Sequence, residues 1–348
     1  MEKQLTIAMP SYNVEGLISR GLESLSDPRL ADALEVVVVD DGSTDGTAEV
    51  ARRFVEAHPD VFRLVSKENG GHGSAVNAGL DAARGRYFRV VDADDWVDPE
   101  GLAAELALLP GISSDIVVDV RRDVHMGTGS TELRPLPDGL PTGREVTFAS
   151  VSAEAARTNC VSIHTVSART DFLRACGVRL LEHTFYVDTQ LVVEATARAE
   201  TVTLLDLEVY QYLVGNASQS VAAEGYVRRF DDHDRVVREV CRFVEGRLAD
   251  PSTTPEAAEY LRLRARLLVN THYNVMLVYD RDRRRGRARA RSFRAWLGTE
   301  HPWLRAATDG RFLAALAAGA VRLDASALDR LLGRMDHEAA GDKHTELN

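Results

Sequence analysis

The sequence predicts an α/β fold in which helices flank a mostly parallel sheet, followed by a C-terminal helical region. Two observations support this prediction. Short, continuously apolar runs alternate with amphipathic helical segments through roughly the first hundred residues, which is typical of strand–helix–strand crossovers. Near residue 222 the pattern changes, and mainly helical periodicity follows. We therefore expect two domains, residues 1–222 and 223–337, with a disordered tail over 338–348.

The individual elements follow from the periodicity. Apolar runs without alternation, as in strands buried on both faces, predict strands at 5–9, 34–40, 61–66, 86–92 and 115–120. Capped amphipathic segments predict helices at 15–25, 42–59, 74–85, 101–109, 170–177 and 185–199. Residues 125–145 are polar and predict a hairpin or loop, 161–170 a strand, and 201–215 two further β-rich runs. Helices are predicted beyond residue 225 at 226–248, 257–280 and 323–335.

Composition excludes some classes of function. The 348 residues carry a formal net charge of -11, which argues against a general nucleic-acid binder because phosphate neutralisation needs surplus Lys and Arg. Three scattered cysteines without metal-ligand spacing fit a reducing compartment. No signal-peptide pattern or apolar run of about 18 residues occurs. We expect a cytoplasmic protein, and the sequence leaves its oligomeric state open.

Polar residues gather where four consecutive predicted strands end. Ligands of open parallel sheets bind beyond the carboxyl ends of the strands, so a shared cleft explains this pattern better than four solvated loops. The four groups are Pro10 to Asn13, Asp40 to Ser43, Lys67 to His72, and Asp92 to Asp95.

The fourth group, VVDADDWVD, places three carboxylates in one turn. Such charges repel one another unless a cation, backbone donors or water compensates them. A hard divalent cation with a phosphate-bearing ligand would do so. In Asp92-x-Asp94, one carboxylate can bind the metal and the other a sugar hydroxyl, in either order. The alternative is a solvated turn followed by a helix N-cap.

The other strand ends offer recognition groups. Asp41 supplies acceptors for a base N–H or a ribose hydroxyl, whereas the GSTD that follows reads as a turn and helix cap. Tyr12 either stacks on a base or packs at the sheet end. The glycines around Gly71 let backbone approach a ligand, with Asn77 or Lys67 adding side-chain contacts. They do not form a dinucleotide fingerprint, because Val76 occupies the third glycine position.

As an ordered set, PSYN, VDDGSTDGT, ENGGHGSAVNAG, GRYFRVVDADDW and FYVD resemble family 2 glycosyltransferases of the GT-A fold, a Rossmann-like architecture, over residues 4–221. The resemblance implies sugar transfer from a nucleotide-diphosphate donor, most often a UDP-sugar, to a hydroxyl acceptor, with Mn²⁺ or Mg²⁺. It further implies that Tyr12 and Asp41 contact the base, Asp92 the ribose or sugar, and Asp94 the metal. Pro10 and Ala93 fall within the same donor motifs.

The resemblance also implies an inverting mechanism with Asp188 as the general base. Many relatives have Glu-Asp at this point, whereas this chain has Val187-Asp188, so any role of that Glu is absent. An isolated Asp in a first helical turn would instead be explained by the helix dipole. The segment YQYLVGNASQSV resembles a loop that closes over the diphosphate, with Gln219 and Ser220 as weak candidates for contacts.

Two rival functions and one partner remain open. A sugar-phosphate nucleotidyltransferase would carry a Gly-rich, Arg-containing loop after the first strand, which PSYNVEG lacks. A non-catalytic nucleotide-sugar-binding scaffold would bind without turnover. The basic segment 281–296 predicts either peripheral contact with anionic lipid, which would bring the enzyme to a lipid-linked acceptor, or an ordinary solvated helix.

Overall fold

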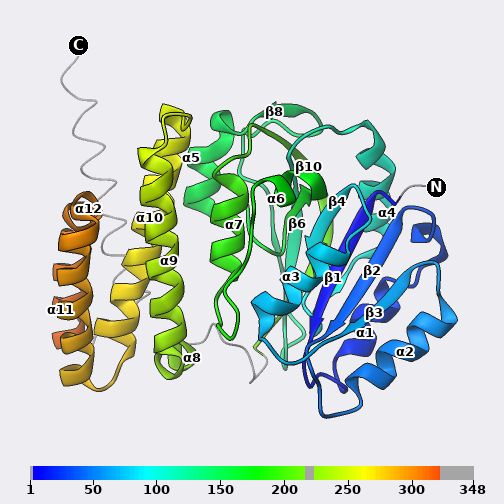
Figure 1. Ribbon diagram of the computed structural model, residues 1–348, viewed down its shortest axis with the longest axis horizontal. Coiled ribbons are helices and arrows are strands. Elements are labelled where there is room, and N and C mark those ends of the chain that lie inside the picture. Colours follow the sequence, from blue (N-terminus) through cyan, green and yellow to red (C-terminus); the bar gives the residue numbers. More distant parts are fainter. Residues whose placement is uncertain (1–2, 216–222, 322–348) are drawn as a thin grey trace. The chain divides into compact units, whose positions relative to one another are not determined.

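The structure is a computed structural model that describes residues 3–215 and 223–321. The chain divides into two compact units. The first combines Met1–Gln219 with Gly246–Leu261, and the second combines Ser220–Glu245 with Arg262–Asn348. The predicted α/β fold, with helices beside a mostly parallel sheet and a helical C-terminal region, is confirmed (Figure 1). The predicted boundary near residue 222 stays a prediction.

The first unit begins with parallel strands in the order β3-β2-β1-β4. They are β1 (Leu5–Ser11), β2 (Leu34–Asp40), β3 (Phe62–Ser66) and β4 (Tyr87–Val90). The crossovers contain α1 (Ile18–Ser24), a 3₁₀ turn η1 (Pro28–Leu30), α2 (Thr47–Ala57) and α3 (His72–Ala82). Pairing of β1 with β2 continues to Ser11, whereas its pairing with β4 ends at Ala8 and Val90. The sheet therefore opens at its carboxyl edge between these strands.

The sheet continues in the order β9-β6-β10-β5. These strands are β5 (Trp96–Val97), β6 (Ile116–His125), β9 (Val166–Arg169) and β10 (Thr201–Val214). β9 is antiparallel to both β4 and β6, while β10 is parallel to β6. Two short strands, β7 (Thr131–Arg134) and β8 (Glu145–Thr147), pair antiparallel with β6 and β10.

One prediction about this half was wrong. The stretch 201–215, predicted to contain two β-rich runs, forms one strand, β10, over Thr201–Val214. The apparent break arises from register shifts against β6 between Leu204 and Glu208 and again between Glu208 and Tyr210. Such bulges bend a strand without ending it. The predicted hairpin within 125–145 is confirmed by the pairing of β7 with β6.

Strand alternation places two hydrophobic clusters on opposite faces of the sheet. Ile7, Val36 and Val38 pack into the larger cluster with residues of α1 and α4, while Val37 and Val39 pack against α3. The remaining helices of this unit are α4 (Pro99–Leu108), η2 (Leu109–Gly111), α5 (Ala149–Thr158), α6 (Thr170–Ala175) and α7 (Asp188–Thr196). Helices on both faces leave the carboxyl edge of the parallel strands for the polar loops.

The second unit is helical. Its elements are α8 (Ala223–Arg228), parts of α9 (Phe230–Ala249) and α10 (Pro255–Asn274), a π-helical turn (Val275–Tyr279), α11 (Arg283–Glu300) and α12 (Pro302–Ala320). The basic segment 281–296 lies mostly on α11, and Phe293 is buried there. Among residues 3–215 and 223–321, every helix is too short or too polar to cross a bilayer. The predicted helix 323–335 and tail 338–348 lie outside the described residues.

Candidate active site

The loops after β1 and β2 are tied together by polar side chains. Asn13, which has a left-handed φ of 52°, accepts a hydrogen bond from the Thr44 N–H at 2.8 Å. Glu15 accepts one from the Gly46 N–H at 3.0 Å. Tyr12 directly precedes Asn13 in the chain and is 49% exposed. A large ring held exposed at the edge of a sheet is available for stacking, in contrast to the alternative of a buried ring. Pro10 itself is buried in β1.

Asp41 organises the loop after β3. Its Oδ1 accepts from Lys67 Nζ at 2.8 Å and its Oδ2 from the Gly71 N–H at 2.7 Å, and the Gly70 N–H donates to both oxygens. The carboxylate is 2% exposed. A base that contacts Asp41 would therefore meet an acceptor that is already oriented by three donors. The predicted partners Asp41, Lys67 and Gly71 form one connected group.

The glycines at the start of α3 allow another part of the backbone to pack closely against them. In this structure that backbone belongs to the segment before α7. A Cβ at Gly73 would lie 2.3 Å from the Leu181 carbonyl oxygen. A Cβ at Gly71, where φ is 83°, would lie 3.2 Å from the His183 backbone. The His183 N–H also donates to the Gly70 carbonyl. The ENGGHG loop thus supports the segment that leads into α7.

Asn77 joins the same two elements. Its Nδ2 donates to the Leu180 carbonyl at 3.0 Å and its Oδ1 accepts from the Leu180 N–H at 2.9 Å. Both ends of the amide are thereby engaged in the protein. Direct binding of a ligand by Asn77 stays a prediction. In the structure, its two hydrogen bonds hold the segment before α7 in position.

The acidic turn between β4 and β5 contains one buried carboxylate, that of Asp95, and two that are partly exposed. Asp95 is 1% exposed, and it accepts hydrogen bonds from the Tyr210 hydroxyl at 2.6 Å and the Leu213 N–H at 2.7 Å. Burial raises the pKa of Asp95 well above its usual value. Asp92 and Asp94 are half-buried, and Ala93 between them is buried. The outer pair, Asp92 and Asp94, therefore offers the accessible oxygens.

Asp92 lies between two histidines. Its Oδ1 is 3.8 Å from His72 Nδ1, and its Oδ2 is 3.9 Å from His164 Nε2. Desolvation raises the pKa of Asp92 to about 6; His72 opposes the rise, while Asp94 and Asp188 add to it. The contribution of Asp188 shows that its carboxylate is close enough for the two charges to repel. The turn carries more negative charge than its neighbours neutralise.

His164 was not among the residues predicted from the sequence. It lies just before β9, where its ring packs edge-on against Tyr210 at 4.9 Å and tilted against Tyr212 at 4.6 Å between centroids. Its carbonyl accepts from the buried guanidinium of Arg89 at 2.6 Å. An arginine inside the apolar run RYFRVV was a signal of such buried bonding. A lone histidine in a β-type run carries no signal of its own.

Asp188 is the first residue of α7 and is half-buried. Its approach is constrained, because Tyr186 is held at a φ of 69°, which is rare for a bulky residue and is found where surrounding structure enforces it. Across the described parts of the chain, no hydrogen-bond or ion-pair partner of the Asp188 carboxylate is found. Its lone pairs are thus open to a substrate proton.

A cavity of about 510 Å³ adjoins the acidic turn. Asp94 and Trp96 form one wall and the tip of the β6–β7 hairpin, including His125 and Met126, forms another. The guanidinium of Arg20 stacks 3.1 Å above the centre of the Trp96 ring. The cavity is the space next to Asp94 into which a substrate could extend.

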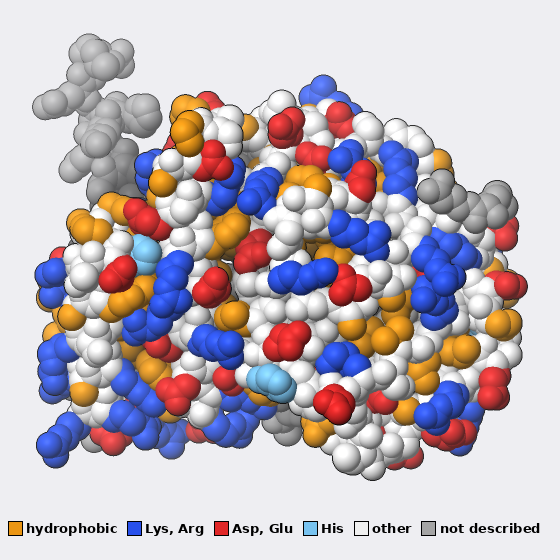
Figure 2. Space-filling model, viewed as in Figure 1, with side chains coloured by type: hydrophobic (Ala, Val, Ile, Leu, Met, Phe, Trp, Pro, Cys, Tyr) orange, Lys and Arg blue, Asp and Glu red, His pale blue; other side chains and the backbone are white. Residues whose placement is uncertain are grey.

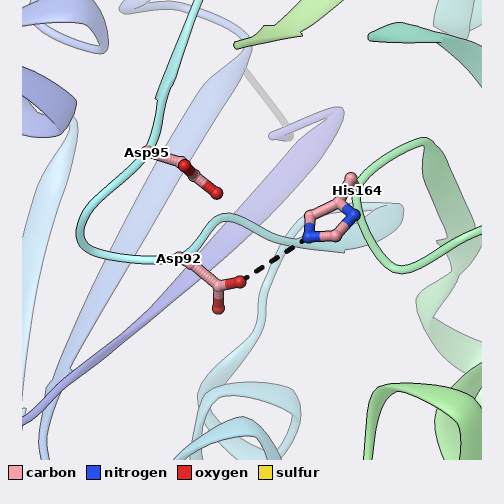
Figure 3. A group of neighbouring side chains, drawn as sticks. All are labelled: Asp92, Asp95 and His164. Atoms are coloured by element: carbon pink, nitrogen blue, oxygen red, sulfur yellow. Dashed lines mark ion pairs between the residues drawn. The ribbon is translucent and has the colours of Figure 1, made fainter. Parts of the chain in front are cut away.

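The acidic turn contains groups that could bind a divalent cation. Asp92, Asp95 and His164 present ligand atoms within 4.8 Å of one another (Figure 3). Asp95 already accepts two hydrogen bonds, so Asp92 with Asp94 supplies the oxygen ligands that Mg²⁺ and Mn²⁺ prefer. Desolvation is the main cause of the raised pKa of Asp92, and the negative charges of Asp94 and Asp188, which add to the rise, also favour a cation. These residues fit the metal predicted from the sequence.

Solved structures share this fold. The chain superposes on *S. aureus* TarS 1-349 in complex with UDP-GlcNAc with a TM-score of 0.62 and 17% identity, covering 92% of each chain. It also resembles mannosyltransferase PcManGT from *Pyrobaculum calidifontis*, in complex with GDP-Man and Mn²⁺, with a TM-score of 0.50 and 20% identity over 92% of this chain and 87% of that one. The architecture is thus that of GT-A type transferases.

Sequence comparison finds similarity to glycosyltransferases over the first part of the chain. Residues 6–164 match the model of glycosyl transferase family 2. The putative glycosyltransferase EpsH of *Bacillus subtilis* is 31% identical over 114 residues, or 33% of this chain and 32% of EpsH. Chondroitin synthase of *Pasteurella multocida* is 40% identical over 104 residues, or 30% of this chain and 10% of that protein. The glycosyl transferase family 2 model thus matches a little under half of this chain, and the matched segment covers about a third of the length of EpsH.

Hydrogen bonds join three of the predicted site residues, Asp41, Lys67 and Gly71. Tyr12 follows β1, and Asp92 and Asp94 share the turn after β4. Gln219 and Ser220 lie outside the described residues.

Proposed function

We propose that the chain is a metal-dependent, inverting glycosyltransferase that moves a sugar from a nucleotide-diphosphate donor, most simply a UDP-sugar, to a hydroxyl acceptor. The observation that carries this proposal is that Asp92 and Asp94 lie half-buried at the carboxyl edge of the sheet, while the half-buried Asp188 carboxylate has no hydrogen-bond or ion-pair partner among the described residues. In a family 2 glycosyltransferase such acids would serve an activated donor on one side and accept a proton on the other. The acceptor class fits glycan, lipid-linked or small-molecule hydroxyls.

Each group then has a role. Tyr12 and Asp41 bind the base, Asp92 contacts the ribose or sugar, and Asp94 with Asp92 holds Mn²⁺ or Mg²⁺. The cation would neutralise charge on the departing diphosphate. Asp188 accepts the proton of the attacking hydroxyl on the face opposite the leaving group, which inverts the anomeric centre.

The donor names in the related structures support this choice. TarS is described with UDP-GlcNAc and PcManGT with GDP-Man and Mn²⁺, so UDP and GDP sugars are the first donors to test. A nucleotidyltransferase is less suited to the site, because the loop after β1 is held against the start of α2 by Asn13 and Glu15 and has no Arg-containing, Gly-rich cradle.

The proposal is tested by separating binding from turnover. Calorimetry should detect binding of UDP that needs Mn²⁺ in the wild-type chain, and Asp94→Ala should abolish it. Asp188→Asn should retain that binding. The rate of hydrolysis of whichever nucleotide sugar the wild type cleaves, with water in place of the acceptor, should fall by about 100-fold or more. Asp171→Asn, an exposed acid in the first turn of α6, is the matched control. Binding without turnover in the wild type, over a panel of UDP and GDP sugars, would favour the scaffold alternative.

A further inference from the structure

The cluster of Asp92, Asp95 and His164 has the composition of a metal site with one histidine ligand (Figure 3). Whether His164 can serve as that ligand depends on which ring nitrogen carries the proton. A metal binds the lone pair of an unprotonated nitrogen. The nitrogen that faces Asp92 is Nε2, so a metal ligand here would require the proton on Nδ1.

The neighbour of Nδ1 decides the tautomer. Arg121 Nη1 lies 3.2 Å from His164 Nδ1. A guanidinium can only donate hydrogen bonds and stays protonated in proteins, so the Nδ1 atom must be the acceptor. In the neutral ring the proton is then on Nε2, as assigned from this hydrogen bond. The nitrogen that faces Asp92 is therefore a donor and has no lone pair for a metal.

The ring cannot readily turn to exchange its nitrogens. It is held between the rings of Tyr210 and Tyr212, and the carbonyl of the same residue accepts a hydrogen bond from buried Arg89. Arg121 is in turn fixed by Asp123, whose Oδ1 lies 3.0 Å from its Nε. These contacts present the Nε2–H in one direction, toward the Asp92 carboxylate.

The distance between the two groups indicates what lies between them. At 3.9 Å, Nε2 and Asp92 Oδ2 are too far apart for a direct hydrogen bond. One oxygen atom about 2.8 Å from each would complete both contacts. Because Nε2–H can only donate and the carboxylate can only accept, that oxygen must accept from one side and donate to the other. A water molecule does both, and so does a ligand hydroxyl group that takes the place of that water.

We propose that His164 and Asp92 together bind one sugar hydroxyl of the nucleotide-sugar donor, and that His164 is a specificity-determining residue and not a metal ligand. This inference rests on the proposed function. His164 and Asp92 would bind a sugar that has this hydroxyl group more tightly than its deoxy analogue. Without the hydroxyl group, both side chains would lack a hydrogen-bond partner. The hydroxyl belongs either to the ribose or to the transferred sugar, which share this chemistry.

The first test is spectroscopic. Electron spin-echo modulation of Mn²⁺ bound with UDP to the wild-type chain should show no directly coordinated nitrogen, and His164→Phe, which keeps a ring between the tyrosines, should change Mn²⁺ affinity by less than about threefold. Nitrogen coupling that disappears in His164→Phe would overturn the inference. A wild-type chain that binds neither UDP nor Mn²⁺ would instead remove the proposed function, and this inference with it.

The second test identifies the hydroxyl. His164→Phe should weaken binding by about 3- to 10-fold, the range expected for one hydrogen bond, and His164→Gln, whose amide N–H reaches a similar position, should restore most of it. If the loss occurs with UDP itself, the hydroxyl is on the ribose; if it occurs only with UDP-GlcNAc, it is on the sugar. Unchanged affinity for both ligands in a folded His164→Phe chain would refute the assignment.

Discussion

Asn77 on α3 holds both backbone groups of Leu180, donating to its carbonyl at 3.0 Å and accepting from its N–H at 2.9 Å. These two hydrogen bonds link α3, which follows the ENGGHG loop, to the segment that leads to Asp188. The two sides of the proposed reaction are thereby held by one side chain. Small displacements of a reacting group can cost about 100-fold in rate, so the link has a measurable consequence.

Asn77→Ala should therefore lower turnover by about 10- to 100-fold with little change in UDP affinity. The substitution leaves the Leu180 N–H and carbonyl without their partner, so the segment before α7 loses its position. Calorimetry of UDP with Mn²⁺ and nucleotide-sugar hydrolysis would measure the two quantities. A weakened UDP affinity with normal turnover would show instead that Asn77 contacts the donor directly.

Gly73→Ala should destabilise the chain and displace the same segment. A Cβ at this position would stand 2.3 Å from the Leu181 carbonyl oxygen, and overpacking of this kind costs about 1–3 kcal/mol. Thermal unfolding would record the lower midpoint. Gly111→Ala, where nothing lies within 4 Å of the added carbon, is the control and should leave the midpoint almost unchanged. Equal behaviour of the two variants would contradict the close approach.

The pKa of Asp92 predicts how cation binding depends on pH. Desolvation raises this pKa from 3.8 to about 6, so a proton on Asp92 stabilises the fold, and this contribution is lost as the pH rises from about 4 through 6. A cation replaces that proton. Below pH 6 its affinity should fall by up to about tenfold per pH unit, as one proton must leave for each cation bound.

Scanning calorimetry with Mn²⁺ alone checks this expectation. The rise in unfolding temperature on adding Mn²⁺ should be full at pH 7.5 and clearly smaller at pH 5. Asp92→Asn should show a small Mn²⁺ effect at both values. An equal rise at pH 5 and 7.5 in the wild type would mean that Asp92 does not bind the cation.

The sequence predicted the carboxyl edge of the parallel strands because that edge is set by local pattern. Apolar runs located the four parallel strands, and parallel strands bring their carboxyl ends together. Tyr12, Asp41 and Asp92 follow from this rule. Asp188 depended on resemblance to a family, since an acid in a first helical turn has an ordinary structural explanation.

The sequence did not reveal the contacts that join distant segments. Asn77 and Leu180 are 103 residues apart in the chain, and no periodicity relates them. The glycines before α3 were predicted to face a ligand, whereas their neighbours are backbone atoms of Leu181 and His183. The tautomer of His164 follows only from its contact with Arg121, which lies on β6. Contacts between residues so far apart in the sequence become visible only in the folded structure.

The basic helix α11 supplies the last prediction. Its apolar face is used inside the second unit, where Phe293 is buried and Trp296 packs against it at 5.4 Å between ring centroids. Insertion of these aromatic rings into a bilayer is therefore disfavoured. Among the described residues, three exposed arginines of α11 have no ion-pair partner, and their spacing of three and four places them on one stripe: Arg284, Arg287 and Arg291. Figure 2 shows Lys and Arg side chains in the region where Figure 1 places α11.

Contact with a membrane through α11 should therefore be electrostatic and sensitive to salt. Vesicles that contain anionic lipid should sediment the wild-type chain at low ionic strength, and replacing the three arginines with glutamine should lower the bound fraction several-fold, since each contributes about 1 kcal/mol near such a surface. Arg52, Arg53 and Arg144 replaced together provide a control of equal charge. The effect should vanish at about 0.5 M salt, where charges are screened over a few ångströms. Equal sedimentation of both variants and the wild type would leave α11 as an ordinary solvated helix.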